Sequence, residues 1–160
     1  MNGVFAGCAL AVALGLTARA SSPPSVVDFI EAAGTEVLVY APVMRDRDQA
    51  RALRAAVAER GVRVTILSEP EAATEPSSYL MSLRLAGASV FLARVPNGAR
   101  GLLVVDGRVA VSGAGVGRRT LPFEAALRLE ETRNVPALRA WFLNALRAAR
   151  PLNPSSLTGR

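Results

Sequence analysis

The stretch NGARGLLVVDGRVAVSGAGVG, residues 97–117, predicts a β-hairpin around which the rest of the chain is organised. Two apolar runs, residues 102–105 and 109–111, lie on either side of Asp106-Gly107. Glycine accepts the positive φ that a tight turn requires, so Asp-Gly between two β-prone runs is a strong hairpin signal. We therefore expect a hairpin over residues 101–112, followed by a glycine-rich turn.

The rest of the chain alternates helices and strands, which predicts an α/β fold with a mixed central sheet flanked by helices. We expect helices at 26–33, 79–86 and 135–149, and strands at 36–41, 62–67 and 88–93. A further helix, capped by Asp46 or Asp48, is expected to run to Arg60. The strand–helix–strand unit over 36–67 predicts parallel strands with a right-handed crossover. Residues 68–78 are expected to form a loop. Periodicity leaves residues 123–131 open between strand and helix.

Apolar spacing divides the predicted helices into buried and exposed faces. The buried face of the last helix is expected to comprise Leu138, Trp141, Phe142, Ala145 and Leu146. Trp141 is therefore predicted to be a core residue. In the second helix, Arg47, Arg51 and Arg54 lie away from the apolar stripe and are expected to be solvated.

The residue types that the chain lacks exclude most catalytic chemistry. The 160 residues include no histidine, and all 19 basic residues are arginine. A Ser-His-Asp triad, a Cys-His pair and histidine-ligated metal are therefore excluded. Arginine stays protonated and cannot replace lysine as a nucleophile or base. A single cysteine, Cys8, excludes an intramolecular disulfide and a thiolate zinc site.

The net charge of +6 favours polyanionic partners such as nucleic acid or anionic lipid headgroups. The same charge also fits arginines spread over solvated helix faces, because it is distributed along the chain and not clustered.

The N-terminal 20 residues read as a secretory signal peptide. An apolar stretch at 4–16 is too short to span a membrane comfortably, and Ala18-Arg19-Ala20 matches a cleavage site after Ala20. No positive charge precedes the apolar stretch, so an uncleaved anchor stays open. We predict export, with a folded domain at 21–150 and a disordered tail at 151–160.

The hairpin resembles the core motif of the phospholipase D superfamily, H-x-K-x4-D-G followed by a strand and G-S-x-N. Aligned on Asp106-Gly107, the family glycine is matched by Gly113. The other family positions hold Ala99 for histidine, Gly101 for lysine, Ala114 for serine and Val116 for asparagine, while Glu124 lies where an acidic residue often steadies the histidine.

The resemblance covers about residues 26–146 and implies one half of a phospholipase D-like domain, with a strand carrying Glu124. Single-half members include small bacterial exported endonucleases, which pair as homodimers at the active-site face. In active members a histidine attacks phosphorus, whereas Ala99 and Gly101 supply neither a nucleophile nor a cation. Asp106 alone is no catalyst and is expected to cap its own turn.

We therefore expect a catalytically inactive phospholipase D-like domain, a pseudoenzyme that binds nucleic acid or another phosphodiester as a dimer, with no cofactor and no metal. Two alternatives stay open. One is residual phosphodiesterase activity, in which a metal would be held by Glu69, Glu71 or Asp106. The other is a structural partner for an active family half.

The anion-binding candidates are Arg100, Arg118 and Arg119, because the loops that carry them line the phosphate pocket in the family's geometry. The alternative is that they are rim residues, solvated or paired with Glu130 and Glu131. A dinucleotide fingerprint over residues 113–118 is less favoured, because Arg118 stands where the third glycine is required.

Overall fold

The computed structural model describes residues 24–96, 99–118 and 127–153. A seven-stranded mixed sheet in the order β6-β5-β4-β1-β2-β3-β7 forms its centre, which confirms the predicted fold class. The strands are β1 (Glu36–Tyr40), β2 (Arg63–Ser68), β3 (Ser89–Leu92), β4 (Leu102–Val105), β5 (Val109–Ser112), β6 (Arg128–Leu129) and β7 (Arg150–Pro151). The helices are α1 (Val26–Glu31), α2 (Arg47–Ala58), α3 (Leu80–Leu85) and α5 (Val135–Arg147), with 3-10 turns η1 (Pro70–Ala73) and η2 (Thr132–Asn134).

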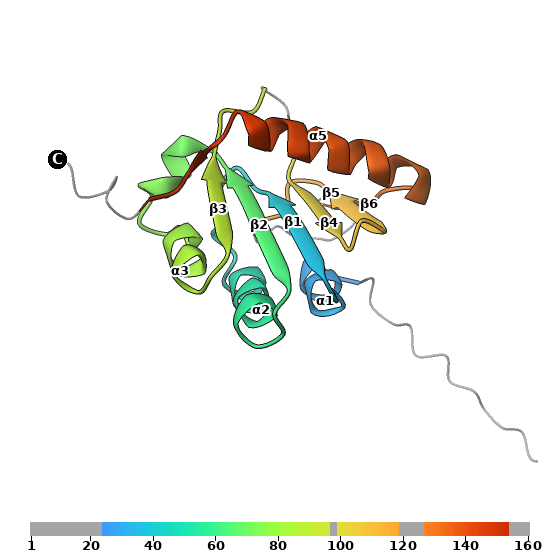
Figure 1. Ribbon diagram of the computed structural model, residues 1–160, viewed down its shortest axis with the longest axis horizontal. Coiled ribbons are helices and arrows are strands. Elements are labelled where there is room, and N and C mark those ends of the chain that lie inside the picture. Colours follow the sequence, from blue (N-terminus) through green and yellow to red (C-terminus); the bar gives the residue numbers. More distant parts are fainter. Residues whose placement is uncertain (1–23, 97–98, 119–126, 154–160) are drawn as a thin grey trace, which may run out of the picture.

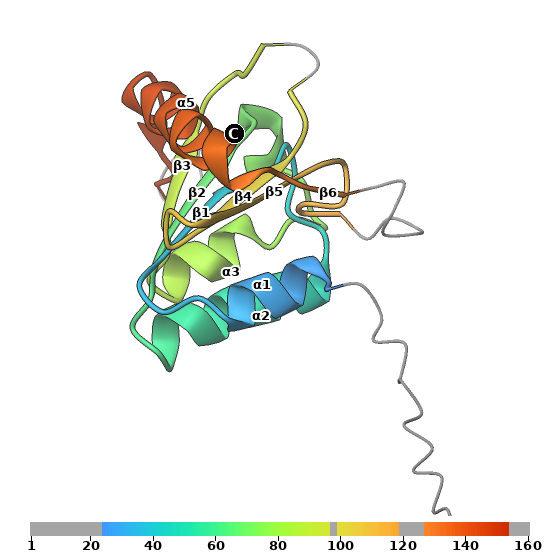
Figure 2. The ribbon, with the colours of Figure 1, turned by 90° about the vertical axis from the view of Figure 1, so that its right-hand side faces the viewer.

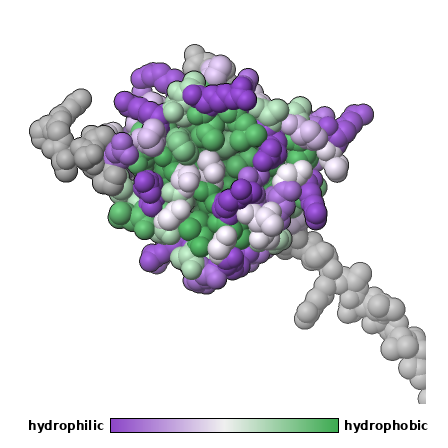
Figure 3. All heavy atoms as spheres, viewed as in Figure 1, coloured by the Kyte–Doolittle hydropathy of each residue, from purple (hydrophilic) through white to green (hydrophobic). Residues whose placement is uncertain are grey.

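The helices form two unequal layers. Helices α1, α2 and α3 cover one face of the sheet, and α5 alone lies across the other (Figures 1 and 2). Each layer has its own apolar core, one centred on Leu53 and Ile66 and the other on Tyr40 and Phe142. Figure 3 shows apolar residues gathered between the two helical layers, with hydrophilic side chains around them.

Strand β1 is the central strand of the sheet because it is apolar on both faces. Residues Val37 to Tyr40 are all buried, as the unbroken run VLVY predicts for a strand covered on both sides. It pairs in parallel with β2, from Glu36 with Arg63 to Tyr40 with Leu67, which confirms the predicted strand–helix–strand unit. On its other side it pairs antiparallel with β4, Val37 facing Val105 and Tyr40 facing Leu102.

The predicted hairpin is present as β4 and β5. Asp106 and Gly107 have φ values of 51° and 64°, the two positive values that a type I′ turn needs. The turn is closed by the Arg108 amide, which donates to the Val105 carbonyl at 2.9 Å. Asparagine, aspartate and glycine tolerate this conformation best, which is why Asp106-Gly107 predicted the turn correctly.

The Asp106 side chain does not cap its own turn, and that prediction is wrong. Its carboxylate crosses to the segment that enters β1 and accepts hydrogen bonds from the amides of Gly34 (2.9 Å), Thr35 (2.8 Å) and Glu36 (2.8 Å), and from the Thr35 hydroxyl (2.8 Å). Burial disfavours its charged form, but these donors outweigh that cost and hold the pKa of Asp106 well below its ordinary value.

Of the two candidate caps, Asp46 is the one that caps α2, its carboxylate accepting from the amides of Asp48 and Gln49 at 2.9 Å each. At the far end of the same helix, the Arg60 guanidinium donates to the carbonyls of Ile30, Glu31 and Ala33 at the end of α1. The last carbonyls of a helix lie beyond its regular hydrogen-bond ladder and can accept from other groups, so Arg60 joins α1 to α2.

Two further predictions need correction. The tail predicted at 151–160 is wrong for its first residues, because β7, which includes Pro151, pairs with β3 and the Leu152 side chain is 1% exposed. Residues 154–160 lie outside the described residues. The loop predicted at 68–78 contains η1, since Pro70 favours a helical first turn.

Trp141 was also misassigned to the core. It is 37% exposed, while Phe142 beside it is fully buried.

Some predictions fall partly or wholly outside the described residues. For the open segment 123–131, the described part contains the short strand β6. Residues 1–20 and Glu124 lie outside the described ranges. Within those ranges, no helix is both long enough and apolar enough to cross a membrane.

Replacing Asp106 by asparagine tests the link between the hairpin and β1. Asp106→Asn keeps the tolerance for positive φ but removes the charge that strengthens the hydrogen bonds. We expect the free energy of unfolding to fall by about 2–4 kcal/mol, measured by urea denaturation near pH 7.

The same pair of proteins should show a defined pH dependence. Because the pKa of Asp106 is lowered by folding, its contribution is complete above about pH 4 and is lost as pH falls further. The stability difference between the two proteins should therefore shrink in acid. A difference that stays constant from pH 7 to pH 2.5 would contradict this assignment.

Candidate functional site

Three chain segments meet at one edge of the sheet and enclose a cavity. Because β1 and β4 are antiparallel and β4 and β5 form a hairpin, Tyr40, Leu102 and Ser112 lie side by side at this edge. The residues beyond them surround a cavity of about 390 Å³. Its lining consists of Pro42, Ala99, Arg100, Gly101, Ala114, Val116 and Arg118. We call it the arginine pocket.

The arginine pocket brings together most of the positions singled out in the sequence. Ala99, Gly101, Ala114 and Val116, where the phospholipase D motif has its chemical groups, all line it. Two of the three candidate arginines line it as well. Arg119 and Glu124 lie outside the described residues.

Asp106 is the exception among the family positions. It lies at the opposite end of β4, roughly 13 Å away along a four-residue strand.

The two arginines are the charged groups of this lining. Both Arg100 and Arg118 are exposed, and neither makes an ion pair or hydrogen bond within the described part of the chain. The alternative pairing predicted for them is not found there, because Glu130 lies 3.9 Å from Arg128 and Glu131 is paired with Arg133. Other arginines are occupied, as Arg139 is by Glu36 at 3.0 Å.

Close packing fills the position where the family has lysine. A Cβ added to Gly101 would lie 2.6 Å from the Val116 Cβ and 2.8 Å from the Gly113 carbonyl oxygen. These contacts are shorter than side chains make, and one is with the backbone, which cannot rotate away. The glycine also accepts a 2.8 Å hydrogen bond from the Gly113 amide. Lysine therefore cannot be restored here without displacing the glycine-rich loop.

The loop over residues 113–117 is held by Gln49 of α2, a residue that the sequence analysis did not single out. The Gln49 side-chain amide, 5% exposed, donates to the Gly115 carbonyl at 2.7 Å and accepts from the Gly117 amide at 2.8 Å. The spacing Asp46-x-x-Gln49 matches a capping box, in which the glutamine would bond back to the helix cap. Only the fold shows that the amide bonds across to the loop.

Gly117 itself has room for no side chain. Its φ is 79°, and an added Cβ would lie 2.4 Å from the Val43 carbonyl oxygen. Its own carbonyl accepts from the amides of Arg45 (2.7 Å) and Asp46 (3.1 Å), just before α2. The loop is therefore fixed to the start of α2 at both its amide and its carbonyl, and Arg118 leaves it in a defined direction.

The acidic loop does not form a metal site with Asp106. Glu69 accepts hydrogen bonds from the Tyr40 hydroxyl and the Val95 amide, while Glu71 pairs with Arg94 and Glu75 with Arg45. No group of three acidic or cysteine side chains suited to a metal ion occurs among the described residues. Asp106 lies at the other end of the sheet, so the metal alternative that needs these carboxylates together has no geometric support.

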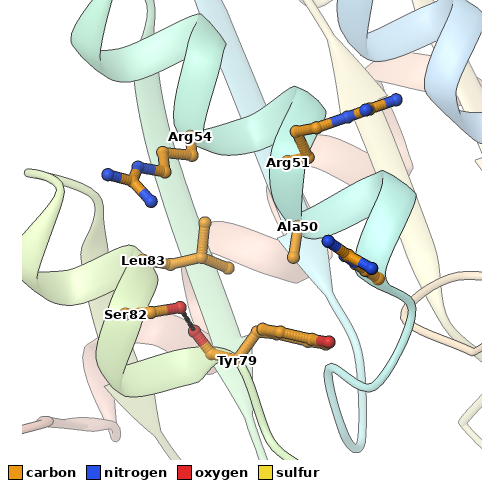
Figure 4. A pocket seen from close by; sticks show the side chains of 7 residues that line it. Ala50, Arg51, Arg54, Tyr79, Ser82 and Leu83 are labelled. Atoms are coloured by element: carbon orange, nitrogen blue, oxygen red, sulfur yellow. Dashed lines mark hydrogen bonds between the residues drawn. The ribbon is translucent and has the colours of Figure 1, made fainter.

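A second group of arginines lies on the other side of the molecule, between α2 and α3. Arg47, Arg51 and Arg54 line a groove of about 320 Å³. Figure 4 shows Ala50 and Leu83 between the two helices, with Tyr79 and Ser82 on the α3 side. Arg51 lies 3.8 Å from Asp48, and its side chain is 80% exposed. The three side chains are solvated as predicted, over an apolar floor.

Comparisons with solved structures agree with this fold. The chain superposes on Nuc from Salmonella typhimurium, a phospholipase D family member, with a TM-score of 0.66 and 16% identity over 79% of this chain and 88% of that one. For NucT from Helicobacter pylori the TM-score is 0.65, with 19% identity over 79% and 87%. The fold is therefore the phospholipase D-like fold that the hairpin motif predicted.

A third structure shares the fold over part of its length. TrmBL2, an archaeal chromatin protein described with a novel mode of DNA binding, superposes with a TM-score of 0.53 and 15% identity over 79% of this chain. The chain spans about half of that protein, 49% of its length. The sequence matches no protein-family model and no curated protein sequence.

Adding one methyl group at Gly101 tests the packing of the arginine pocket. Gly101→Ala should lower the free energy of unfolding by about 1–3 kcal/mol, because the loop must move away from the new Cβ. Gly34→Ala is the matched control, since its Cβ meets no atom closer than 3.6 Å. Equal stability of the two variants in urea denaturation would contradict the close packing.

Replacing Gln49 by leucine should release the glycine-rich loop. The change leaves the Gly115 carbonyl and the Gly117 amide without partners, which costs about 2–4 kcal/mol of stability. Hydrogen exchange of the Gly117 amide should accelerate beyond the change in global stability. Asn144→Leu, at an exposed amide on α5, is the control. Unchanged exchange at Gly117 would disprove the role given to Gln49.

Proposed function

We propose that this chain binds nucleic acid or another phosphodiester at the arginine pocket without cleaving it. The observation that carries the proposal is the lining of the pocket. At the place where the resemblance puts histidine and lysine, the chain has Ala99 and Gly101, beside two arginines that have no partner among the described residues. The two arginines can bind an anion, and the residues that line the pocket include no nucleophile that could attack it.

Arginine suits phosphate binding because its planar guanidinium donates two parallel hydrogen bonds to phosphate oxygens. Arg100 precedes β4 and Arg118 follows the glycine-rich loop, so the two charges approach the cavity from different segments. The other residues that line the pocket are small and uncharged, which leaves room for a phosphodiester to enter. The net charge of +6 adds a long-range attraction for polyanions.

Turnover by the family mechanism requires a nucleophile and a general acid of suitable pKa. The chain has no histidine and no lysine to supply them. Two hydroxyls lie near this edge, that of Ser112, which donates to the Glu130 carboxylate, and that of Tyr40, which donates to Glu69. Ser112→Ala therefore tests whether any residual phosphodiesterase activity depends on the hydroxyl that lines the adjoining cavity.

Two expectations from the sequence belong to the same proposal. The first is export through cleavage after Ala20. The second is pairing of two copies through the face that carries the arginine pocket, as the resemblance to single-half members implies. Mass spectrometry of the protein from its source cells and light scattering of the purified chain test them separately.

The proposal predicts a salt-dependent, non-hydrolytic complex with DNA. We expect the 160-residue chain to bind fluorescent oligonucleotides with an affinity that falls as salt rises, because bound cations are released. Arg100→Ala/Arg118→Ala should weaken binding at least about tenfold and reduce the slope of log K against log salt by about 1–2. Fluorescence anisotropy measures both quantities, and electrophoresis of the same samples detects cleavage.

Two double variants with the same change in net charge serve as controls. Arg84→Ala/Arg108→Ala removes exposed arginines away from the pocket and should leave affinity within about threefold. Arg47→Ala/Arg54→Ala removes two of the three arginines that line the groove between α2 and α3. If that variant loses more affinity than the pocket variant, the binding site lies in the groove and the proposal is wrong. Cleavage abolished by Ser112→Ala would overturn the non-catalytic assignment.

A further inference from the structure

A second cavity adjoins the arginine pocket and shares two of its lining residues, Ala99 and Arg100. It measures about 280 Å³ and is lined, besides those two, by Leu102, Ser112, Glu130, Leu138 and Trp141. Ligand pockets usually begin at about 300 Å³, so this one suits a single ring system better than a larger molecule. We call it the tryptophan pocket.

Trp141 is held in place on one side and exposed on the other. Its ring lies 5.6 Å from that of Tyr40, at an interplanar angle of 72°, the edge-to-face arrangement that aromatic pairs favour. Tyr40 is buried, and its hydroxyl donates to Glu69 at 3.0 Å, so the ring beneath the indole is fixed. Burial first, and then the Glu69 carboxylate, raise the pKa of Tyr40 and keep it neutral. The indole is thus a preorganised surface that no other part of the described chain fully covers.

The two cavities differ in the charged side chains that line them, and this difference indicates which chemical group each can bind. The arginine pocket has two cations and no carboxylate in its lining. The tryptophan pocket has Arg100 together with Glu130, whose side chain is 12% exposed and accepts from the Ser112 hydroxyl. A phosphate would be repelled by that carboxylate, whereas a neutral flat ring would not. The second cavity is therefore unsuited to phosphate and suited to an uncharged aromatic group.

We propose that the tryptophan pocket binds one unpaired nucleobase of the nucleic acid whose phosphate lies in the arginine pocket. This inference rests on the proposed function and specifies its ligand as single-stranded. A base inside a duplex is stacked and paired, so it cannot lie on a side chain without leaving the helix. Stacking on an aromatic side chain is the usual way in which proteins hold unpaired bases.

The polar groups of the tryptophan pocket add a preference among bases. Glu130 offers carboxylate oxygens as hydrogen-bond acceptors, and the exocyclic amine of cytosine is a donor that carboxylates bind. Thymine lacks that amine. Oligonucleotides of cytosine are therefore expected to bind more tightly than those of thymine, and Glu130→Gln should reduce this difference.

Trp141 is the single tryptophan of the chain, so its fluorescence reports directly on the pocket. The full chain is titrated with a decamer of deoxycytidylate and with an abasic phosphodiester of equal length and charge. The deoxycytidylate decamer should shift or quench the tryptophan emission and bind about 5- to 150-fold more tightly, the range that one stacked base contributes. The abasic strand should bind with the same salt dependence and little change in emission.

Variants at position 141 separate stacking from folding. Trp141→Ala should lower the affinity for the deoxycytidylate decamer to that for the abasic strand and leave the abasic affinity unchanged, as measured by anisotropy of labelled strands. Trp141→Phe keeps a ring against Tyr40 and should retain part of the preference. Leu85→Ala, at an apolar side chain that is 74% exposed on α3, is the control for loss of surface area. Thermal melts establish that each variant is folded.

The outcomes distinguish failure of the base-binding proposal from failure of the proposed phosphodiester binding. Equal, salt-dependent binding of both strands by the unmodified chain would overturn the base pocket and leave the phosphate site standing. Binding of neither strand would overturn the proposed function itself. A preference for deoxycytidylate that persists in Trp141→Ala would place the base elsewhere and disprove the assignment to this cavity.

Discussion

The arrangement of the site depends on the bonds between the Asp106 carboxylate and the entry to β1. One side chain accepts from three consecutive amides and a hydroxyl at residues 34–36, and so fixes the hairpin against the central strand. With Val105 held opposite Val37, the antiparallel register places Leu102 opposite Tyr40 at the other end. The residues before β4 and after β5 then meet around one cavity. Asp106 thus acts on the site from the opposite end of the sheet, through the register of the strands.

The cavity owes its shape to close packing of the backbone around it. Gly101 lies so close to Val116 and to the Gly113 carbonyl that even a methyl group has no room, and Gly117 lies as close to Val43. Gln49 then satisfies the Gly115 carbonyl and the Gly117 amide of the loop over residues 113–117. Small residues here permit close backbone packing, which leaves the arginines at the rim as the groups available to an anion. On our proposal, holding a phosphodiester and stacking its base replace the chemistry for which the family's motif is built.

Much of the frame was predictable from local patterns. The run VLVY at 37–40 indicated a strand buried on both faces, Asp106-Gly107 indicated the hairpin, and Asp46 indicated the start of α2, because each signal depends on neighbouring residues alone. The predicted candidates Arg100 and Arg118 do line one cavity, because the hairpin that was predicted between them brings its two ends together. Trp141, Gln49 and the role of Asp106 were not predictable in this way. Their partners Tyr40, Gly115 and Gly34 are distant in the chain. The spacing of apolar residues along a helix also does not distinguish a buried indole from one at the margin of the core.

By itself, then, the sequence determined the fold class, the hairpin, the parallel strand pair and the exclusion of histidine and lysine chemistry. These follow from composition and from conformational preferences that act within a few residues. The tertiary structure alone decided what surrounds each polar group. It showed that Asp106 supports the sheet and that the glutamates of the acidic loop are bonded to Tyr40, Arg94 and Arg45. It also showed that Arg100 lines two adjoining cavities, of which one has a second arginine in its lining and the other has Glu130. Such roles depend on which distant segments the sheet brings into contact, and that contact is set by register and packing rather than by any local pattern.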